Sequence, residues 1–256
     1  MIAYERRGEA AWITLDRPAK KNALHLDGWR DLREALERAE SEASVAVVTG
    51  VEDVFSAGDD IAVIEGADTL ADLDELVAAL GDVLFGIETL DVPVIAAVNG
   101  LAYGGGCELV AAADLAVATP DATFALPEAS IGAYPPYAAE RVAETVGKKR
   151  FMELALTAQP IGAERAADWG LLNRVVSPAD LESTVDELVA AIAATPAASI
   201  RTTKRVVAAR AREAGERERV RGGFAQVRAD EECRTATERF LGGGSEDSRS
   251  GGDPEV

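Results

Sequence analysis

Short apolar runs alternate along the chain with longer segments whose apolar residues recur every three or four positions. The short runs contain few polar residues, which is typical of strands buried on both faces. The pattern predicts strands at 3–6, 11–16, 45–49, 92–98 and 115–118. It predicts helices at 26–39, 73–87 and 104–113. Because strands and helices alternate, we expect an α/β fold with a parallel sheet covered by helices.

From about residue 178 the pattern becomes wholly helical, and Pro196 separates two of its segments. Helices are predicted near 181–192, 200–212 and 224–240. The final residues are rich in glycine, serine and aspartate, which predicts disorder. We therefore expect a core domain at 1–195, a C-terminal helical region at 196–241 and a disordered tail at 242–256. The helical region is too thin for an enzyme domain of its own, so we expect it to cover the sheet domain or to mediate subunit contact.

Charge excludes several classes of partner. The 256 residues include 45 Asp and Glu against 26 Lys and Arg, for a formal net charge of −19. This balance argues against nucleic acid and anionic membrane surfaces, which require a basic footprint. No apolar run is long enough to span a bilayer and no signal peptide opens the chain, so we expect a cytoplasmic protein. Its two cysteines, Cys107 and Cys233, suit a reducing compartment, and a single histidine, His25, argues against a His-based triad or metal site.

Lysine is scarce among the basic residues. Only five of the 26 are lysine, at positions 20, 21, 148, 149 and 204. Abundant acidic residues with little lysine are typical of a halophilic protein, because salt screens the self-repulsion of its charges. A GC-rich genome, which favours arginine and alanine codons, gives the same composition. The sequence leaves both explanations open.

The segment from Val98 to Glu108 is the most informative for chemistry. A buried strand is followed by three glycines, Gly104–Gly106, and then by a helix with Glu108 in its first turn. The first amides of a helix have no internal acceptor and lie at the positive end of its dipole, where they stabilise a developing oxyanion. Glu108 would lie beside that oxyanion as an acid or base. The same glycines also suit close packing of helix on strand, with Glu108 merely favouring the helix N-terminus.

Two further segments place main-chain amides or an acidic residue where they could act on a ligand. The small-residue loop within 55–61 follows a predicted strand, and two such loops together provide a pair of N–H donors for one oxygen. Pro127 suits the first position of a helix, which places Glu128 in its first turn. Glu128 is therefore either a charge that complements the helix dipole or a second acid or base. Two carboxylates in one cleft push their pKa values apart, as acid/base catalysis requires.

These three segments, together with 13–18, 22–24 and 162–176, resemble in order and spacing the crotonase (enoyl-CoA hydratase/isomerase) superfamily. The resemblance is strong over about residues 2–195 and weak over the last helices. It implies a spiral of ββα units followed by C-terminal helices that trimerise, and thus a homotrimer or a hexamer built from trimers. It also implies an acyl-CoA thioester as substrate, with no metal and no redox cofactor.

The resemblance also implies a role for individual residues. In this family two backbone N–H groups hold the thioester oxygen, and by position these belong to Asp59 and Gly105. Glu108 and Glu128 occupy the positions of the two glutamates with which hydratases add water syn across a 2,3-unsaturated acyl-CoA. One orients and deprotonates the water that attacks C3, and the other, by our assignment Glu128, delivers a proton to C2. The residues implied to contact the CoA part of the substrate are Lys20, Asn22, Ala23, Ala57, Asp59, Asp60 and Ile61.

One departure from the family keeps alternatives open. After Gly132 the chain reads Pro-Pro-Tyr-Ala-Ala at 135–139, where many hydratases have a glycine-rich run that is one residue longer. Pro136 aligns with the glycine whose N–H helps to hold the catalytic water, and proline has no N–H. Tyr134 and Tyr137 either reshape the acyl pocket or simply pack. The alternatives are a Δ3-Δ2-enoyl-CoA isomerase, which uses a single glutamate, and a non-catalytic acyl-CoA-binding relative.

Overall fold

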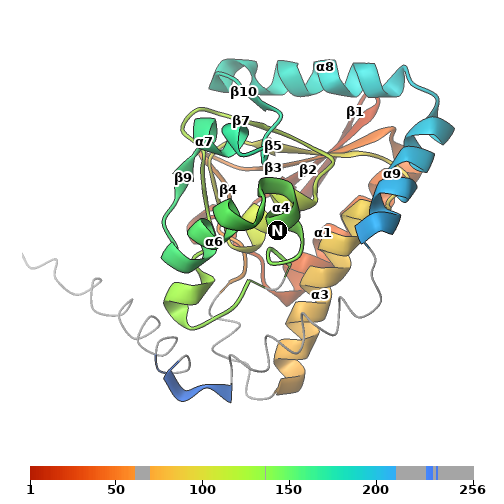
Figure 1. Cartoon of the computed structure of the whole chain (residues 1–256). Coiled ribbons are helices and arrows are strands. Elements are labelled where there is room, and N and C mark those ends of the chain that lie inside the picture. The colour runs from red at the N-terminus through yellow and green to blue at the C-terminus, as the bar shows by residue number, and fades with distance from the viewer. Residues whose placement is uncertain (61–69, 136, 212–228, 233–234, 236–256) are drawn as a thin grey trace, which may run out of the picture.

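The computed structural model describes residues 1–60, 70–135, 137–211, 229–232 and 235 (Figure 1). Predictions for Ile61, Pro136, Cys233, most of the helix at 224–240 and the tail at 242–256 lie outside the described residues. The strands are β1 (Ile2–Arg7), β2 (Ala10–Leu15), β3 (Val45–Gly50), β4 (Val54–Ser56), β5 (Val94–Val98), β6 (Leu101–Tyr103), β7 (Leu115–Ala118), β8 (Thr123–Ala125), β9 (Ile161–Gly162) and β10 (Arg174–Val175). The α-helices are α1 (Leu26–Glu42), α3 (Leu70–Thr89), α4 (Gly105–Ala112), α5 (Arg141–Val146), α6 (Lys148–Thr157), α7 (Ala163–Asp168), α8 (Leu181–Ala193) and α9 (Ala197–Ala211). Three short 3₁₀ helices are η1 (Pro18–Lys20), η2 (Glu128–Ile131) and η3 (Pro178–Asp180).

The predicted strands form a six-stranded sheet in the order β1-β2-β3-β5-β7-β10. β1 pairs with β2 antiparallel, and every other neighbouring pair is parallel. Alternate residues of each central strand face opposite sides, so that Ala46 and Val48 join one apolar cluster while Val45 and Val47 join the other. The prediction of a parallel sheet buried on both faces is therefore confirmed.

A second sheet, which the sequence pattern did not predict, contains β4, β6, β8 and β9. Each of the pairs β3/β4, β5/β6 and β7/β8 is consecutive in the chain but divides between the two sheets. α3 follows the first pair, α4 follows the second and η2 follows the third, so the chain winds as a spiral of ββα turns. The expected crotonase-like spiral is thus confirmed from the topology.

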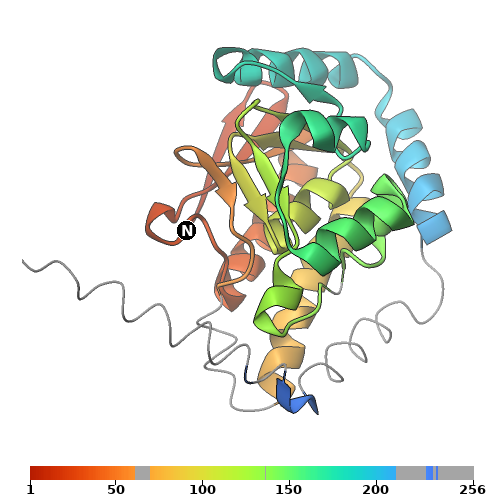
Figure 2. The same cartoon turned by 60° about the vertical axis from the view of Figure 1, so that its left-hand side comes forward.

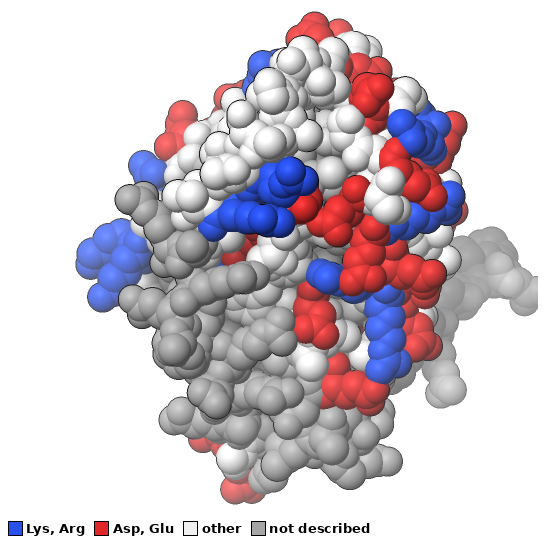
Figure 3. Space-filling view, turned by 90° about the vertical axis from the view of Figure 1, so that its right-hand side faces the viewer, with Lys and Arg blue, Asp and Glu red and all other residues white. Residues whose placement is uncertain are grey.

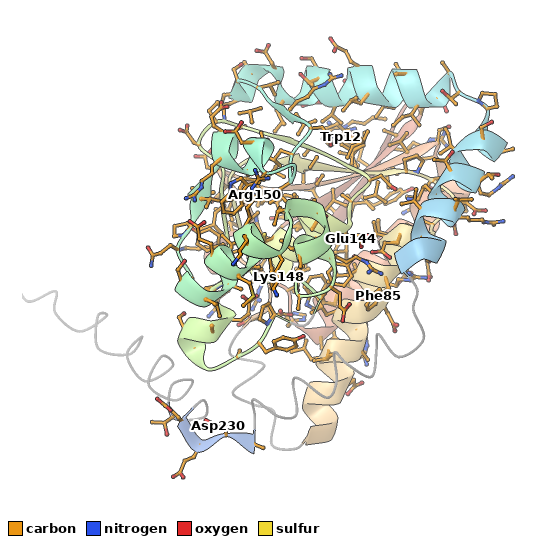
Figure 4. The ribbon with its side chains drawn as sticks, viewed as in Figure 1. Trp12, Phe85, Glu144, Lys148, Arg150 and Asp230 are labelled. Atoms are coloured by element: carbon orange, nitrogen blue, oxygen red, sulfur yellow. The ribbon has the colours of Figure 1, made fainter. Side chains whose placement is uncertain are left out.

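Helices cover both faces of the six-stranded sheet (Figures 1 and 2). α8 lies across one face, where Val185 and Val189 pack on Val45 and Val47. Trp12 lies in this layer between α8 and the sheet (Figure 4). On the other face α1, α3 and α4 pack in the larger apolar cluster, which also holds the residues of the second sheet. The functional site described below lies within this larger layer.

α9 turns down the side of the molecule after a short link at 194–196, where the expected boundary between core and helical region falls (Figure 1). Lys204 anchors it: the buried ammonium donates to Ile87 O at 3.1 Å and Val92 O at 3.0 Å, and it pairs with Asp114. α9 therefore docks on the core, in line with the expectation that the helical region covers the sheet domain.

The surface mixes both signs of charge. On the face that Figure 3 shows, acidic and basic side chains lie side by side. Arginines pair with glutamates one turn away on α1, as in Arg33–Glu37 at 2.6 Å and Arg38–Glu42 at 3.0 Å. This face is therefore not a continuous acidic patch, despite the net charge of the chain. Over the described residues, no helix has the length and apolar character that crossing a bilayer requires.

Candidate active site

Three chain segments meet at one edge of the second sheet. β4 pairs with β6 and β6 with β8, all in parallel, so the carboxyl ends of these strands lie together. The residues that follow are the loop 57–60 after β4, Gly104 after β6 and Pro127 after β8. The amide of Gly104 donates to Ala125 O at 3.0 Å, which ties the second segment to the third. The topology therefore brings together the three segments that sequence analysis selected.

Glycine allows the first two segments to touch. Gly58 has a φ of +84°, and a Cβ on it would lie 2.6 Å from the Gly105 nitrogen and 2.7 Å from Tyr103 O. A Cβ on Gly106 would lie 2.3 Å from Ser56 O. Any side chain at these two positions would force the backbones apart. The glycines therefore do both things that the sequence allowed: they let helix and strand pack closely, and they bring the two loops to one place.

The loop after β4 is held in its shape by buried polar groups. Ser56 Oγ donates to Asn22 O at 3.0 Å and accepts from the Gly58 amide at 3.0 Å. Asn22 is itself buried, and its Nδ2 donates to Val51 O at 3.2 Å and Val54 O at 2.8 Å. Leu24 bridges the loop on both sides, through its amide to Gly58 O at 2.8 Å and its carbonyl to the Asp60 amide at 2.9 Å. These bonds fix the backbone that carries the Asp59 amide.

The amides of Asp59 and Gly105 both border the same cavity. Within the part of the chain that the structure describes, neither N–H donates to a backbone carbonyl. Gly105 is the first residue of α4, where the helix has no acceptor for its amide and the dipole is positive. Such an amide attracts a partial negative charge on a bound ligand. The two residues predicted from the family resemblance thus line one cavity, and the role of their amides as oxyanion donors stays a prediction.

Glu108 lies one turn into α4 and is 1% exposed. Its Oε1 accepts the amide of Ala138 at 2.6 Å. Burial and the charges of Glu128 and Asp59 raise the pKa of Glu108 well above its usual range, whereas the backbone amides of Ala138 and Tyr137 oppose that rise. Glu108 is therefore a fixed carboxyl group whose ionised form is supported by two main-chain donors.

Glu128 begins η2, a short 3₁₀ helix, and Pro127 occupies its N-cap position instead of the first helical position that the sequence indicated. Its Oε1 lies 3.1 Å from the point where a Cβ on Gly104 would be. Its Oε2 is buried and has no hydrogen-bond partner among the described residues. Burial raises the pKa of Glu128 to about 8, the charge of Asp59 adds to the rise, and the residue's own amide opposes it. At neutral pH this carboxyl group therefore holds a proton.

Asp59 contributes a third carboxylate to the cavity, which sequence analysis missed because it assigned this residue an oxyanion amide and a CoA contact but no acid/base role. Trp29 Nε1 on α1 donates to Asp59 Oδ1 at 2.8 Å, and Oδ2 lies 3.3 Å from where a Cβ on Gly105 would be. Burial raises the pKa of Asp59 to about 6, while the Trp29 bond and its own amide hold it down. The helical spacing of Trp29 predicted only a core position, although an indole N–H in a core requires a buried acceptor.

The cavity itself is small and mostly apolar, with a volume of about 70 Å³. α3 supplies one wall through Leu76, Val77 and Leu80, and Ile131 and Tyr134 supply another. Tyr134 thus borders the cavity, in line with one of its two expected roles. Tyr137 does not line the cavity and is buried elsewhere. Within this mostly apolar lining, the polar side chains are the carboxyl groups of Asp59, Glu108 and Glu128 and the hydroxyl of Tyr134, as far as the described residues show.

Several residues predicted to contact the CoA part lie outside this cavity. Asp60 pairs with Arg17 at 2.6 Å, and Lys20 is exposed at the end of η1. Ala23 is buried, and the Asn22 side chain holds the loop as described above. Ala57, in contrast, borders the cavity. Contact of these residues with a nucleotide therefore stays a prediction.

Two remaining residues, His25 and Cys107, have structural surroundings. His25 caps α1, where its Nδ1 accepts the Gly28 amide at 3.1 Å. Cys107 is buried beside Glu108, and burial raises the pKa of its thiol well above the usual range, so it is not an activated nucleophile. No group of three or more His, Cys, Asp or Glu side chains in the described ranges is arranged to hold a metal ion.

The arrangement defines a class of site. One main-chain amide from a loop and one from a helix N-terminus lie next to carboxyl groups with raised pKa values, and such a site suits proton transfer at a carbon beside a carbonyl whose oxygen takes up charge. The family model described as "Enoyl-CoA hydratase/isomerase" matches residues 5–241. The chain therefore belongs to the enoyl-CoA hydratase/isomerase family.

Individual relatives agree with this assignment. The short-chain-enoyl-CoA hydratase of Clostridium acetobutylicum is 33% identical over 211 residues, 80% of this chain and 80% of its own. The carnitinyl-CoA dehydratase of Escherichia coli K12 is 41% identical over 189 residues, 72% and 70% of the two chains. The crystal structure of an enoyl-CoA hydratase/isomerase from Xanthobacter autotrophicus Py2 superimposes with a TM-score of 0.86 at 28% identity, covering 96% of this chain and 93% of that one.

Proposed function

We propose that this chain is an enoyl-CoA hydratase-like lyase that adds water syn across a 2,3-unsaturated acyl-CoA. The observation that carries the proposal is that the buried Glu108 and the half-buried Glu128, whose Oε2 is buried, line one mostly apolar cavity together with Asp59 and Gly105. The relatives named a short-chain-enoyl-CoA hydratase and a carnitinyl-CoA dehydratase support this reaction class.

In the proposed mechanism the thioester oxygen accepts hydrogen bonds from the Asp59 and Gly105 amides. Addition of water to C3 of the alkene pushes electrons onto this oxygen and forms an enolate, and the amides and the dipole of α4 stabilise its charge. Loss of one comparable donor typically costs roughly 2.7–4 kcal/mol of transition-state stabilisation. Without these donors the carbon–carbon double bond would be too weak an electrophile for water.

The two glutamates have separate roles in this proposal. Glu108 accepts a proton from the attacking water, because main-chain donors favour its ionised form. Glu128 delivers its proton to C2, because it is protonated near neutral pH, it lines the cavity, and its Oε2 has no partner among the described residues. Both carboxyl groups border the same cavity, so the new C–O and C–H bonds form on one face of the double bond, which gives syn addition.

We further propose that the protein is a cytoplasmic homotrimer, or a hexamer built from two trimers, and that it uses neither metal nor redox cofactor. Val206 and Val207 are 61% and 64% exposed on α9, in the helical region predicted to trimerise. An exposed apolar pair of this kind favours a subunit contact. The acidic, lysine-poor composition favours a halophilic protein.

The decisive experiment is turnover of a panel of enoyl-CoA thioesters in H₂¹⁸O, followed by mass spectrometry at low and at molar salt. The proposal expects one ¹⁸O atom in a 3-hydroxyacyl-CoA product. A 3-enoyl-CoA converted to the 2-enoyl isomer with no label would instead identify the isomerase, which the missing amide of Pro136 favours. Acyl-CoA binding with no reaction on any thioester would identify the non-catalytic relative.

A further inference from the structure

The side chain of Tyr137 belongs to a buried cluster next to the site. Its hydroxyl donates to Glu88 Oε1 at 2.7 Å. Arg141 Nη2 donates to Glu88 Oε2 at 3.0 Å, and its Nε also donates to Oε1. Tyr137 is 1% exposed, and the side chains of Arg141 and Glu88 are 8% and 14% exposed. Glu88 thus joins the end of α3 to the start of α5 through two side chains.

Tyr137 is fixed at both of its ends. Its ring packs edge-on against Phe85 of α3, with ring centroids 5.0 Å apart, and Phe85 lies on the α3 side of this cluster (Figure 4). Its carbonyl accepts the amide of Arg141 at 2.9 Å. Arg141 therefore holds the main chain of Tyr137 directly and holds its hydroxyl through Glu88.

This cluster leads directly to a proposed catalytic group. The peptide after Tyr137 carries the Ala138 amide, which donates to Glu108 Oε1 at 2.6 Å. We propose that Tyr137 is a positioning residue: its bond to Glu88 holds the Ala138 amide on Glu108 and so favours the ionised form that Glu108 needs as base. The inference rests on the proposed function through that role of Glu108.

The sequence around the cluster explains why a side-chain anchor is needed. Positions 135 and 136 are both proline, so neither provides an N–H donor. The first amides after them are those of Tyr137 and Ala138, and both oppose the rise in the pKa of Glu108. The support of Glu108 from this segment therefore depends on the position of two consecutive amides, which lie on either side of the Tyr137 side chain.

The ionisation of Glu108 also depends on the groups around it. Glu128 from η2 and Asp59 from the loop after β4 raise its pKa by like charge, and the Cys107 thiol and Tyr137 hydroxyl are near enough to feel its charge. Only the amides act in the opposite direction. Loss of the Tyr137 anchor would leave the like charges in place and weaken the amides, so the pKa of Glu108 would rise further.

The test is the variant Tyr137→Phe, which removes the hydroxyl and keeps the ring against Phe85. We expect kcat to fall about tenfold, the effect of one hydrogen bond to a charged group, while KM changes less than about twofold. The acid limb of the kcat–pH profile, which reports ionisation of the base, should move to higher pH by about half a unit or more.

Tyr4→Phe is the matched control. Tyr4 donates to Glu42 Oε2 at 3.0 Å, and Arg38 Nε donates to Oε1 of the same carboxylate at 3.0 Å. The control therefore removes a tyrosine hydroxyl from the same kind of Tyr–Glu–Arg cluster, but far from the candidate site in the sequence. It should leave kcat and the pH profile unchanged. If Tyr137→Phe lowers kcat equally at every pH, or leaves it unchanged, the proposal is wrong. Thermal unfolding of both variants shows whether the folded state persists, and Glu88→Gln, expected to shift the limb in the same direction, replaces Tyr137→Phe if it does not fold.

A second readout separates this proposal from the proposed function. The Glu108 carboxyl carbon, labelled with ¹³C and assigned by its absence in Glu108→Gln, is titrated by NMR in the wild type and in Tyr137→Phe. The proposal expects a higher apparent pKa in the variant, whether or not the protein turns over any enoyl-CoA. An unchanged titration would overturn it even if hydratase activity is found. A raised pKa without hydratase activity would keep the positioning of Glu108 and reject only the proposed reaction.

Discussion

Glu108 and Glu128 are the same residue type at the start of two helical segments, and both border one cavity. Glu108 belongs to an α-helix and accepts a main-chain amide at 2.6 Å from the segment after the prolines. Glu128 begins a four-residue 3₁₀ helix, and its Oε2 has no partner in the described part of the chain. One carboxyl group is therefore held by the protein, and the other has a place for a hydrogen bond to a ligand.

This difference indicates how one cavity separates a base from an acid. Donors aimed at a carboxylate favour its charged form, whereas burial without donors favours the neutral form. Burial raises the pKa of Glu108 and of Glu128 alike, so burial alone does not explain why one would act as the base and the other as the acid. The amides on Glu108 do, because they stabilise a charge there and nothing described stabilises one on Glu128 Oε2.

The largest expected effect comes from removing the acid. Glu128→Gln keeps the size of the side chain but has no proton to deliver, so kcat for hydration should fall about 10²–10⁴-fold with little change in KM. Glu108→Gln should lower kcat by a similar factor, because the water then lacks its base. Steady-state rates on crotonyl-CoA measure both.

Hydrogen exchange distinguishes the two variants. In D₂O at pH 8 and above, where Glu128 is largely ionised, the enzyme should exchange the C2 protons of a saturated acyl-CoA, because the Glu128 carboxylate removes a proton from C2 and returns a deuteron to the enolate. Glu108→Gln should keep this exchange, and Glu128→Gln should lose it. Exchange retained in Glu128→Gln and lost in Glu108→Gln would reverse the assignment of acid and base.

The elements were predictable wherever they are long enough to show a period. The pattern at 45–49 and at 92–98 located β3 and β5, and the apolar spacing of 73–87 located α3. β4, β6 and β8 have three residues each, which is too short for an alternation to appear. The second sheet forms because strands far apart in the chain pair with one another, and no local pattern carries that information.

The parts of the candidate site that follow from local sequence signals could also be predicted. Glycines and acids in the first turn of a helix indicated where Glu108 and Glu128 lie, because capping and close approach are local rules. The Asp59 carboxylate and the Tyr137 anchor were missed, because each depends on a partner 30 to 49 residues away, Trp29 for one and Glu88 for the other. Such pairings are set by the packing of α1 and α3, which the sequence pattern does not specify.

A smaller effect is expected from Gly104→Ala, which should displace the carboxyl group of Glu128 and leave that of Glu108 in place. Gly104 has a φ of +53°, and a Cβ there would lie 3.1 Å from Glu128 Oε1. The backbone strain should cost about 1–2 kcal/mol of stability, and displacement of the Glu128 carboxyl group should lower kcat by up to about 10²-fold. Chemical denaturation and steady-state kinetics measure the two effects separately.

Gly147→Ala is the control for strain. Gly147 has a φ of +83° and no atom of the described structure lies within 4 Å of a Cβ placed on it. It should lose stability by a similar amount and keep its activity. A Gly104→Ala enzyme that is as active as Gly147→Ala would show that the position of Glu128 is not critical.

The smallest effect concerns the third carboxylate. The pKa of Asp59 is about 6, so above this pH the residue is ionised and its charge opposes the enolate that forms beside Gly105. Asp59→Asn keeps the oxyanion amide and still accepts the Trp29 N–H. Above pH 6 its kcat should exceed that of the wild type by about threefold to tenfold, and below pH 5, where Asp59 is protonated, the two should converge. The kcat–pH profiles of both enzymes measure this.

The Trp29 bond sets the pH at which that charge appears. Its N–H lowers the pKa of Asp59 against the effect of burial. Trp29→Phe removes the donor and keeps an aromatic ring near Gly105, so Asp59 should ionise at a higher pH. The lowering of kcat that the Asp59 charge causes should then begin at a higher pH than in the wild type. The raised pKa of Asp59 also makes the free energy of unfolding depend on pH. An acid whose pKa is raised in the folded state stabilises the fold most below about pH 4, and this contribution is lost as the pH rises through 6. If Asp59→Asn leaves both the kcat profile and this pH dependence of stability unchanged, Asp59 does not act on the oxyanion site, and the acid/base assignment rests on the two glutamates alone.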